Sequence, residues 1–271
     1  MNKTSIKETL KKGSLILQNK KEATILLSFF LNKSKLYLIT HEMDKVKDTK
    51  KYFDLIHRRK SGEPIEYITK NVSFYSNNFY IDKGVLIPRP ETELLVDHAK
   101  DIIEKNSFKK IAEIGTGSGI ISVMLSLLLP NIKIIATDIN KKALDIAKIN
   151  AEKFNVRKNI TFIHTTYLDS INQNFDMIIS NPPYIANDFE IDLSLKFEPK
   201  EALFGGENGD EILKDIIDLS IKKEAKYLIC EIGHNQKESI LKYIRRKKLK
   251  KFFFYKDYSG FDRGFVINIK E

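Results

Sequence analysis

The chain has 271 residues, of which 42% are hydrophobic and 30% charged. This composition suits a globular protein with a sizeable core and excludes a mainly disordered chain. The formal charge of +10 allows an anionic partner, but only seven of the 46 basic residues are arginines, and the lysines are spread along the whole chain. Because base readout and bidentate phosphate contacts favour arginine, we expect that nucleic acid is not the partner.

Two features bear on the cell compartment. The apolar run 25–39 is interrupted by Asn32, Lys33 and Lys35, and the first residues lack the layout of a signal peptide. We therefore expect a cytoplasmic protein without a membrane span. The single cysteine, Cys230, lies in the apolar run 227–230, which predicts a buried, unreactive thiol.

Residues 1–70 are expected to form a small helical domain. Apolar residues recur at intervals of three and four from residue 6 to about residue 60, and the polar segments 19–21 and 32–35 separate the predicted helices. No proline precedes Pro64, and no catalytic cluster stands out. This domain is therefore expected to bind something or to brace the rest of the chain.

Residues 71–88 are expected to be a β-hairpin linker. Two alternating runs, 72–75 and 79–81, flank Asn77 and Asn78, and asparagine tolerates the positive φ that a hairpin turn needs. The prolines of the following segment, 87–93, stiffen the chain, and Thr92 or a neighbouring acid can start a helix.

Residues 89–271 are expected to form a second, larger domain, in which short apolar strands alternate with helical periods from Lys110 onward. The strands are predicted at 111–114, 132–137, 160–164, 175–180, 227–231, 252–257 and 265–270, and the helices at 94–103, 120–129, 141–154, 210–222 and 237–246. Alternating strands and helices predict an α/β fold with a doubly wound, mostly parallel, Rossmann-like sheet. Ligands of such sheets bind at the carboxyl ends of the strands.

A glycine-rich segment joins the first of these strands to its helix. Glycines allow close approach of the backbone to a ligand, and the helix N-terminus offers free N–H groups. Asp138 closes the next strand, where a carboxylate can accept both hydroxyls of an adenosine ribose. Ile120 stands where a dinucleotide fingerprint has its third glycine, which favours S-adenosylmethionine over NAD. The glycine-rich segment reads Gly115-Thr116-Gly117-Ser118-Gly119.

The fourth predicted strand is followed by Asn181-Pro182-Pro183-Tyr184. Two consecutive prolines make this loop stiff, and it lies at the same sheet edge as the glycines. A planar amide or aromatic amine nitrogen is a poor nucleophile because its lone pair is delocalised. Acceptors on the Asn181 side chain and the Pro182 carbonyl would orient such a nitrogen and stabilise its developing charge, while Tyr184 packs against the flat group. The loop therefore predicts methyl transfer to a planar nitrogen without a strong general base.

Three further segments accompany this loop in a fixed order. They are Gly62-Glu63-Pro64-x-x-Tyr67-Ile68, Ile87-Pro88-Arg89-Pro90-Glu91-Thr92-Glu93 and Phe197-Glu198-Pro199-x-x-Ala202-Leu203. With the glycine-rich and Asn-Pro-Pro-Tyr segments, they resemble the HemK-type (PrmC) release factor glutamine methyltransferases from about Gly62 to the end of the chain. The resemblance implies a methyltransferase of translation termination, which uses S-adenosylmethionine to methylate N5 of the glutamine in the Gly-Gly-Gln motif of peptide chain release factors.

The resemblance also implies roles for individual parts. The N-terminal domain would dock the body of the release factor, and residues 89–271 would be the methyltransferase domain. Tyr167 stands where the family commonly has an aromatic residue beside the adenine, although a core tyrosine is an alternative. Thr166 departs from the usual aspartate, and Glu113 replaces the more frequent aspartate. Arg89 and Glu198 are expected to border the glutamine pocket, without assigned roles.

The expected site residues therefore fall into two groups. The catalytic group comprises Asn181, Pro182, Pro183 and Tyr184. The cofactor-binding group comprises Gly115, Thr116, Gly117, Ser118, Gly119, Asp138, Tyr167 and Asn181. The five histidines show no metal-ligand spacing, and no metal is expected.

Two other functions stay open at this point. An adenine or guanine amino-methyltransferase acting on DNA or ribosomal RNA would use the same chemistry on another substrate. A non-catalytic RNA-binding protein would share only the fold. The expected state is a monomer whose partners are release factors.

Overall fold

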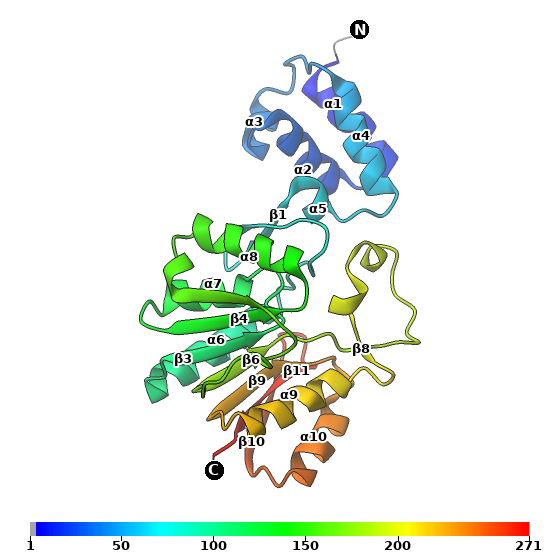
Figure 1. The fold of residues 1–271 in the computed structure, drawn as a ribbon. Helices are drawn as coiled ribbons and strands as arrows, with labels where there is room; N and C mark the ends of the chain where they lie inside the picture. The colour runs from blue at the N-terminus through cyan, green and yellow to red at the C-terminus, as the bar shows by residue number, and fades with distance from the viewer. Residues whose placement is uncertain (1–3, 271) are drawn as a thin grey trace. The chain divides into compact units, whose positions relative to one another are not determined.

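The computed structural model describes residues 4–270, which form two compact units (Figure 1). The first unit comprises Met1–Asn71 and Asp192–Phe197, and the second comprises Val72–Ile191 and Glu198–Glu271. Residues 192–197 are predicted from the sequence to belong to the methyltransferase domain, but they pack with the helical unit. The reason lies at Gly62, where an added Cβ would approach Leu193 Cδ2 to 2.8 Å.

The first unit contains five helices among its described residues: α1 Ile6–Leu17, α2 Lys20–Leu31, α3 Lys35–Thr40, α4 Thr49–Lys60 and α5 Ile65–Thr69. Side chains cap the starts of α1, α2 and α3, and at α1 Ser5 and Glu8 form a reciprocal capping box, whereas α4 and α5 have no side-chain cap. Leu26, Tyr52 and Ile56 are fully buried in the core of the unit. The predicted N-terminal helices are thus confirmed.

The hairpin forms, but its predicted turn is wrong. Strands β1 Asn71–Phe74 and β2 Asn77–Tyr80 pair with each other, so the asparagines begin the second strand. Tyr75 and Ser76 make the turn, with φ of 49° and 56°. The Tyr75 amide donates to Glu93 Oε1 at 2.7 Å and its hydroxyl donates to the Glu93 carbonyl at 3.0 Å. These tertiary contacts place the left-handed residues two positions earlier than asparagine propensity predicts.

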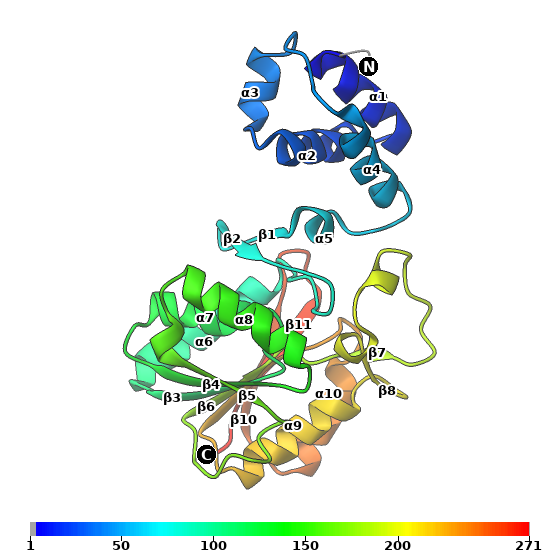
Figure 2. The same ribbon diagram turned by 45° about the horizontal axis from the view of Figure 1, so that its top comes forward.

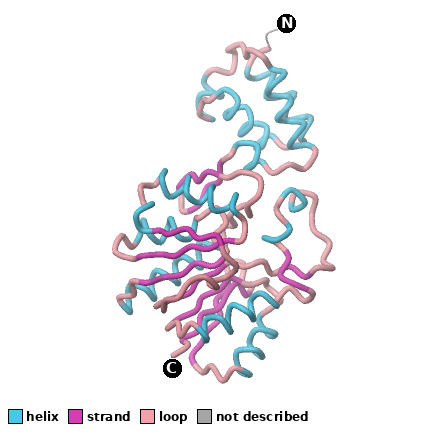
Figure 3. The backbone as a smooth tube through the Cα atoms, viewed as in Figure 1, coloured by secondary structure: helices cyan, strands magenta, loops and turns pink. Residues whose placement is uncertain are grey.

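The second unit is built on a seven-stranded sheet in the order β10-β11-β9-β6-β3-β4-β5. Figure 3 draws strands in magenta. Its strands are β3 Lys110–Ile114, β4 Lys133–Asp138, β5 Ile160–His164, β6 Met177–Ser180, β9 Tyr227–Glu231, β10 Lys251–Lys256 and β11 Asp262–Asn268. Only β11 runs antiparallel to its neighbours. The predicted α/β, mostly parallel sheet is confirmed.

Helices cover both faces of this sheet (Figures 1 and 2). Helices α6 Thr92–Asn106, α7 Ile120–Leu128 and α8 Lys141–Lys153 cover one face, while α9 Glu211–Lys222 and α10 Lys237–Arg246 cover the other. The chain order reverses beside β3, because β4 pairs on one side of it and β6 on the other. Such a switch point leaves a crevice at the carboxyl ends of the strands, which positions the site.

Several short strands and turns complete the fold. The sequence does not predict β7 Ile185–Ala186 and β8 Phe204–Gly206, which pair with each other, nor the 3-10 turns Arg157–Asn159, Leu195–Phe197 and Lys200–Ala202.

Cys230 is fully buried, and burial raises the pKa of its thiol, as expected for an unreactive cysteine. Within residues 4–270, none of the helices has the length and apolar character needed to cross a bilayer.

Candidate active site

The glycines of the loop after β3 serve two purposes. Gly115 and Gly117 adopt φ of +69° and +54°, and a Cβ added to either would meet no atom within 4 Å. The space beside them is therefore open to a ligand. Gly119 differs, because its added Cβ would lie 2.8 Å from Ala147 Cβ on α8. Gly119 is thus required for packing of the loop against α8.

Glu113 lies behind this loop at the end of β3 and is almost fully buried. Its Oε2 accepts hydrogen bonds from Thr116 Oγ1 at 2.9 Å and from the Ser122 amide at 3.1 Å, and also from the Ser122 hydroxyl. Its Oε1 is buried without a partner among the residues that the structure describes. Burial raises the pKa of Glu113 to about 7, although these hydrogen bonds lower it. Glu113 thus holds the loop from inside the protein.

Asp138 ends β4 and lines the pocket. Its Oδ2 accepts from the Gly117 amide at 2.9 Å and its Oδ1 from the Asn140 amide at 2.8 Å. Burial raises the pKa of Asp138, and these two amides oppose that effect. Each carboxylate oxygen keeps a further lone pair, so Asp138 can still accept hydroxyl groups of a ligand.

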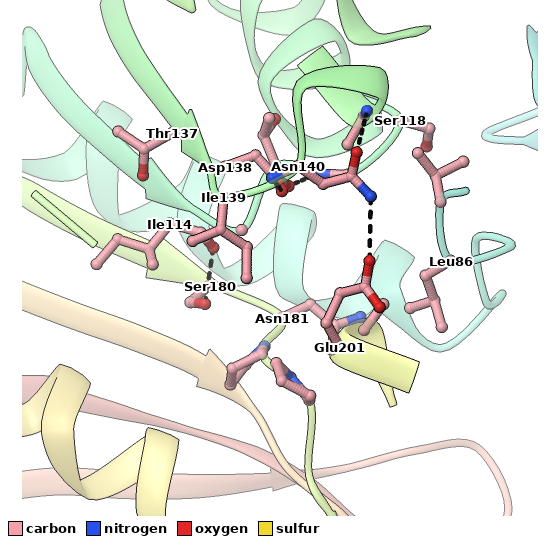
Figure 4. A pocket seen from close by; sticks show the side chains of 18 of the residues that line it. Leu86, Ile114, Ser118, Thr137, Asp138, Ile139, Asn140, Ser180, Asn181 and Glu201 are labelled. Atoms are coloured by element: carbon pink, nitrogen blue, oxygen red, sulfur yellow. Dashed lines mark hydrogen bonds between the residues drawn. The ribbon is translucent and has the colours of Figure 1, made fainter. Parts of the chain in front are cut away.

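Asn140 and Glu201 border the same part of the pocket, and the sequence analysis misses both (Figure 4). The Asn140 Oδ1 caps α8 by accepting from the Lys142 amide at 2.9 Å. Its Nδ2 donates to the Gly84 carbonyl and to Glu201 Oε1, each at 3.2 Å. The asparagine directly before a helical period was a signal for the cap but not for the link to Glu201.

The Asn-Pro-Pro-Tyr loop follows β6 at the same sheet edge. Ser180 anchors its start by donating to the Ile114 carbonyl at 2.8 Å (Figure 4). The Asn181 Nδ2 donates to Thr92 Oγ1 at 3.1 Å, whereas Asn181 Oδ1 is buried and has no partner among the described residues. Asn181, Pro182 and Pro183 line the pocket. A buried acceptor without a donor is costly, so this oxygen is suited to a ligand N–H.

Glu231, at the end of β9, connects this loop to the start of α6. Its Oε2 accepts from Thr92 Oγ1 at 2.7 Å, and its Oε1 accepts from the Tyr184 hydroxyl at 3.3 Å. Glu231 is 1% exposed, and burial raises its pKa to about 7. Neither Glu231 nor the side-chain role of Thr92 is predicted from the sequence, although a charged residue at the end of an apolar strand is a visible signal.

Two contacts hold the backbone of the Asn-Pro-Pro-Tyr loop in place. Gln236 donates through Nε2 to the Tyr184 carbonyl at 2.9 Å. Gly205 passes so close that an added Cβ would lie 2.4 Å from the Pro183 carbonyl oxygen. Both contacts restrict the path of residues 181–184. The Tyr184 hydroxyl is directed to Glu231, and packing of the Tyr184 ring against a flat ligand stays a prediction.

Arg89 and Glu198 form an ion pair beside the pocket. Arg89 Nη2 lies 2.7 Å from Glu198 Oε1, and the Ile87 amide donates to Glu198 Oε2 at 2.8 Å. The Glu198 side chain is 3% exposed. Because Leu86 and Pro88 line the pocket, Glu198 fixes the segment that supplies part of its wall.

The adenine end predicted from the sequence lies at Thr166 and Tyr167, which line the pocket together with Ile139, Ile212 and Ile216. Tyr167 adopts φ of 46°, and its hydroxyl donates to Asp215 Oδ2 at 3.1 Å. The Tyr167 ring is half-buried beside the apolar side chains that line this end of the pocket. Stacking of Tyr167 on adenine stays a prediction.

The structure brings nearly all predicted site residues together. One pocket is lined by Gly115, Thr116, Gly117, Ser118, Asp138, Tyr167, Asn181, Pro182 and Pro183. The open space beside two glycines, a carboxylate at the next strand and an apolar end fit S-adenosylmethionine. Between residues 4 and 270, no three His, Cys, Asp or Glu side chains are grouped as metal ligands.

Comparisons with known proteins show which families the chain is similar to. Residues 4–69 match the PrmC N-terminal domain, and residues 88–197 match the methyltransferase small domain. A release factor glutamine methyltransferase of Dictyoglomus turgidum is 38% identical over 89% of this chain and 88% of its own length. One of Buchnera aphidicola is 36% identical over 95% of both chains. The catalytic domain of hMettl16 in complex with an RNA hairpin shares the fold, with a TM-score of 0.59 and 20% identity over 71% of this chain and 76% of that one.

These relatives exceed 30% identity over nearly the whole chain, and they agree with the segments on which the sequence resemblance rests. The matched domains cover helices α1 to α5 and the glycine-rich and Asn-Pro-Pro-Tyr loops that line the pocket. The chain therefore belongs to the release factor glutamine methyltransferase family.

Proposed function

We propose that the protein transfers the methyl group of S-adenosylmethionine to N5 of the glutamine in the Gly-Gly-Gln motif of peptide chain release factors. Family membership supports the reaction and the substrate. The observation that carries the proposal is the buried Asn181 Oδ1, which has no partner in the described part of the chain and lies in a pocket that also contains the glycine loop. This oxygen is an acceptor suited to an amide N–H.

The chemistry follows from the amide. S-adenosylmethionine supplies an electrophilic methyl group on a positively charged sulfur. Asn181 Oδ1 accepts one amide N–H and the Pro182 carbonyl accepts the other, so the nitrogen lone pair is oriented and the developing positive charge is stabilised. The new N–C bond uses the nitrogen lone pair, while the methyl–sulfur bond breaks and its electron pair returns to sulfur, so that the neutral thioether S-adenosylhomocysteine is the leaving group. The methylated nitrogen becomes acidic and loses one proton to solvent or to a neighbouring oxygen.

The cofactor end is assigned by position. Gly115 and Gly117 offer open backbone, Asp138 accepts ribose hydroxyls, and Tyr167 with its apolar neighbours contacts the adenine. Glu201 adds a carboxylate at the ribose side, hydrogen-bonded to Asn140. Thr166 provides no carboxylate for the adenine amino group.

The helical unit is assigned to docking of the release factor body. Leu36 and Ile39 lie three residues apart on α3, so they share one helix face, and both are about 70% exposed, as is Met43 just after the helix. Exposed apolar side chains that cluster in this way are typical of protein contact surfaces. Changing Leu36 and Ile39 to serine should raise KM for an intact release factor but not for a short Gly-Gly-Gln peptide. Equal KM values for the intact factor in variant and wild type would remove the docking role.

The nucleic-acid alternatives have less support. The RNA-bound hMettl16 domain is 20% identical, which shows a common fold and nothing about the substrate. The relatives with names that specify a substrate name release factors. We also propose that the protein is a monomer and acts in the cytoplasm, where release factors work.

One assay tests this function. Labelled S-adenosylmethionine is incubated with the protein and an intact release factor, with the same factor carrying Ala in place of the Gly-Gly-Gln glutamine, and with bulk RNA. Label should enter only the intact factor. Label in RNA, or equal label in both forms of the factor, would contradict the proposal.

A further inference from the structure

We propose that Thr92 and Glu231 are positioning residues that decide which end of the Asn181 side-chain amide faces the substrate. The inference rests on the proposed function, because it concerns the same substrate amide. Its basis is a chain of two hydrogen bonds that runs from Glu231 through Thr92 to Asn181.

The direction of this chain follows from the number of donors. An ionised carboxylate only accepts hydrogen bonds, and a threonine hydroxyl has a single proton to donate. Thr92 therefore donates to Glu231 Oε2 at 2.7 Å and presents its oxygen lone pair to Asn181. The Asn181 NH2 group must be the end that faces Thr92, at 3.1 Å. Asn181 Oδ1 is then left as the free acceptor.

Reversing the direction of these two hydrogen bonds would block the site. A protonated Glu231 can donate to Thr92, which frees the Thr92 proton to donate to Asn181. The Asn181 amide would then gain by turning over, since its oxygen would face Thr92 and its NH2 group the substrate. Two N–H donors would face each other there, and the substrate amide would lose its acceptor. The ionised state of Glu231 therefore sets the productive orientation.

The surroundings of Glu231 make its ionisation sensitive to pH. Burial raises its pKa to about 7, while the nearby charge of Arg263 and the hydrogen bonds from Thr92 and Tyr184 lower it. The charge of Glu91, next to Thr92 in the chain, raises it. The titratable and charged groups that face Glu231 are Glu91, Tyr184, Tyr255 and Arg263.

Thr92 could be mistaken for a simple helix cap, because it is the first residue of α6. The hydrogen bonds contradict that role. The Thr92 hydroxyl donates to Glu231, 139 residues away, and no side-chain capping bond is found at this helix start. The Asn181 Nδ2 makes its hydrogen bond to the same hydroxyl. A single side chain thus connects the end of β9 to the predicted catalytic loop.

The first test compares Thr92→Val with Thr92→Ser. Valine keeps the shape and removes the hydroxyl, so the Asn181 amide loses its orientation and kcat should fall by about 10- to 100-fold. Serine keeps the hydroxyl, and kcat should stay within about threefold of wild type. Cofactor Kd and KM for the release factor should change little in both variants. An unchanged kcat in Thr92→Val, or an equal loss in Thr92→Ser, overturns the proposal.

The second test uses Glu231→Gln and does not depend on Thr92→Val being stable. Wild-type kcat should decline as pH falls through about 7, because protonation of Glu231 reverses the chain. Glutamine cannot titrate, and its carbonyl can still accept from Thr92, so this decline should be absent in an active variant. A decline that persists unchanged in an active Glu231→Gln variant overturns the role of Glu231 ionisation. A variant that binds cofactor but is inactive supports it, because the glutamine NH2 group can donate to Thr92 as a protonated Glu231 would.

Both tests are read against the wild-type protein. If wild type fails to methylate the release factor, the proposed function fails before the variants are considered. If wild type is active and Thr92→Val is equally active, the function stands and the positioning role fails.

Discussion

Two buried glutamates support the two ends of the pocket in different ways. Glu113 holds the cofactor loop through Thr116 and Ser122, which lie three and nine residues along the chain. Glu231 holds the acceptor loop through Thr92 and Tyr184, which lie 139 and 47 residues away. Burial raises the pKa of both carboxyl groups to about 7.

The difference lies in where the spare hydrogen-bonding capacity is found. Among residues 4–270, Glu113 Oε1 has no hydrogen-bond partner, whereas both oxygens of Glu231 are paired and the acceptor without a partner is Asn181 Oδ1. The cofactor end is thus a locally closed loop. At the acceptor end, the hydrogen bonds from Glu231 through Thr92 orient Asn181 so that its Oδ1 is directed into the pocket. Substitutions at the two ends should therefore separate cofactor binding from turnover.

The largest effect is expected for Asn181→Ala. Loss of an acceptor used in the transition state should lower kcat by roughly a hundred- to a thousandfold. Asn181 also belongs to the expected cofactor-binding group, but cofactor Kd, measured by calorimetry, should rise far less than kcat falls, because Asp138 and the glycine loop are untouched. Asn187→Ala is a matched control, since this asparagine is exposed six positions further along. Unchanged turnover in Asn181→Ala would refute the acceptor role.

Asp138→Ala should produce the opposite pattern. Removing the carboxylate should weaken cofactor binding by about 10- to 100-fold, the cost of one or two charge-assisted hydrogen bonds. The kcat at saturating cofactor should change much less. Asp145→Ala, an exposed aspartate on α8, serves as control. Equal cofactor affinity in the Asp138 variant and wild type would remove this residue from the cofactor site.

A smaller effect is expected at the wall of the pocket. Glu198→Ala removes the partner of Arg89 and leaves the Ile87 amide without its acceptor. A buried unpaired donor costs about 1–3 kcal/mol, so the melting temperature should fall by several degrees. Cofactor Kd should rise a few-fold, because Leu86 and Pro88 belong to this segment. A variant that melts like wild type would show that the ion pair is not needed for the wall.

The smallest effect is the dependence of stability on pH. The folded-state pKa of Glu113 is raised from 4.5 to about 7, so the folded protein retains a proton that the unfolded chain releases. This stabilisation is complete below about pH 4.5 and is lost as pH rises through about 7. The free energy of unfolding should therefore be higher at about pH 5 than at about pH 8 on account of Glu113. This difference between the two pH values should be smaller in Glu113→Gln than in wild type, by on the order of 1 kcal/mol. An identical difference in both proteins would contradict the raised pKa.

The cofactor end could be predicted from sequence because its rules act between neighbours. Gly115 and Gly117 were found from their position between a strand and a helix, and Asp138 from its place at the end of the next strand. Strand and helix periods in the second unit identify the sheet for the same reason. The Asn181 loop was found because two prolines restrict the backbone locally.

The sequence by itself therefore determined the α/β class, the two loops and, through the resemblance, the family. Only the tertiary structure decided which side chains support those loops. Thr92 meets Glu231 because α6 packs against the end of β9, and Glu198 meets Ile87 across 111 residues. The Tyr75 turn replaced the predicted Asn77 turn through contacts to α6. Such pairs depend on which distant segments fold side by side, and no local pattern encodes that choice.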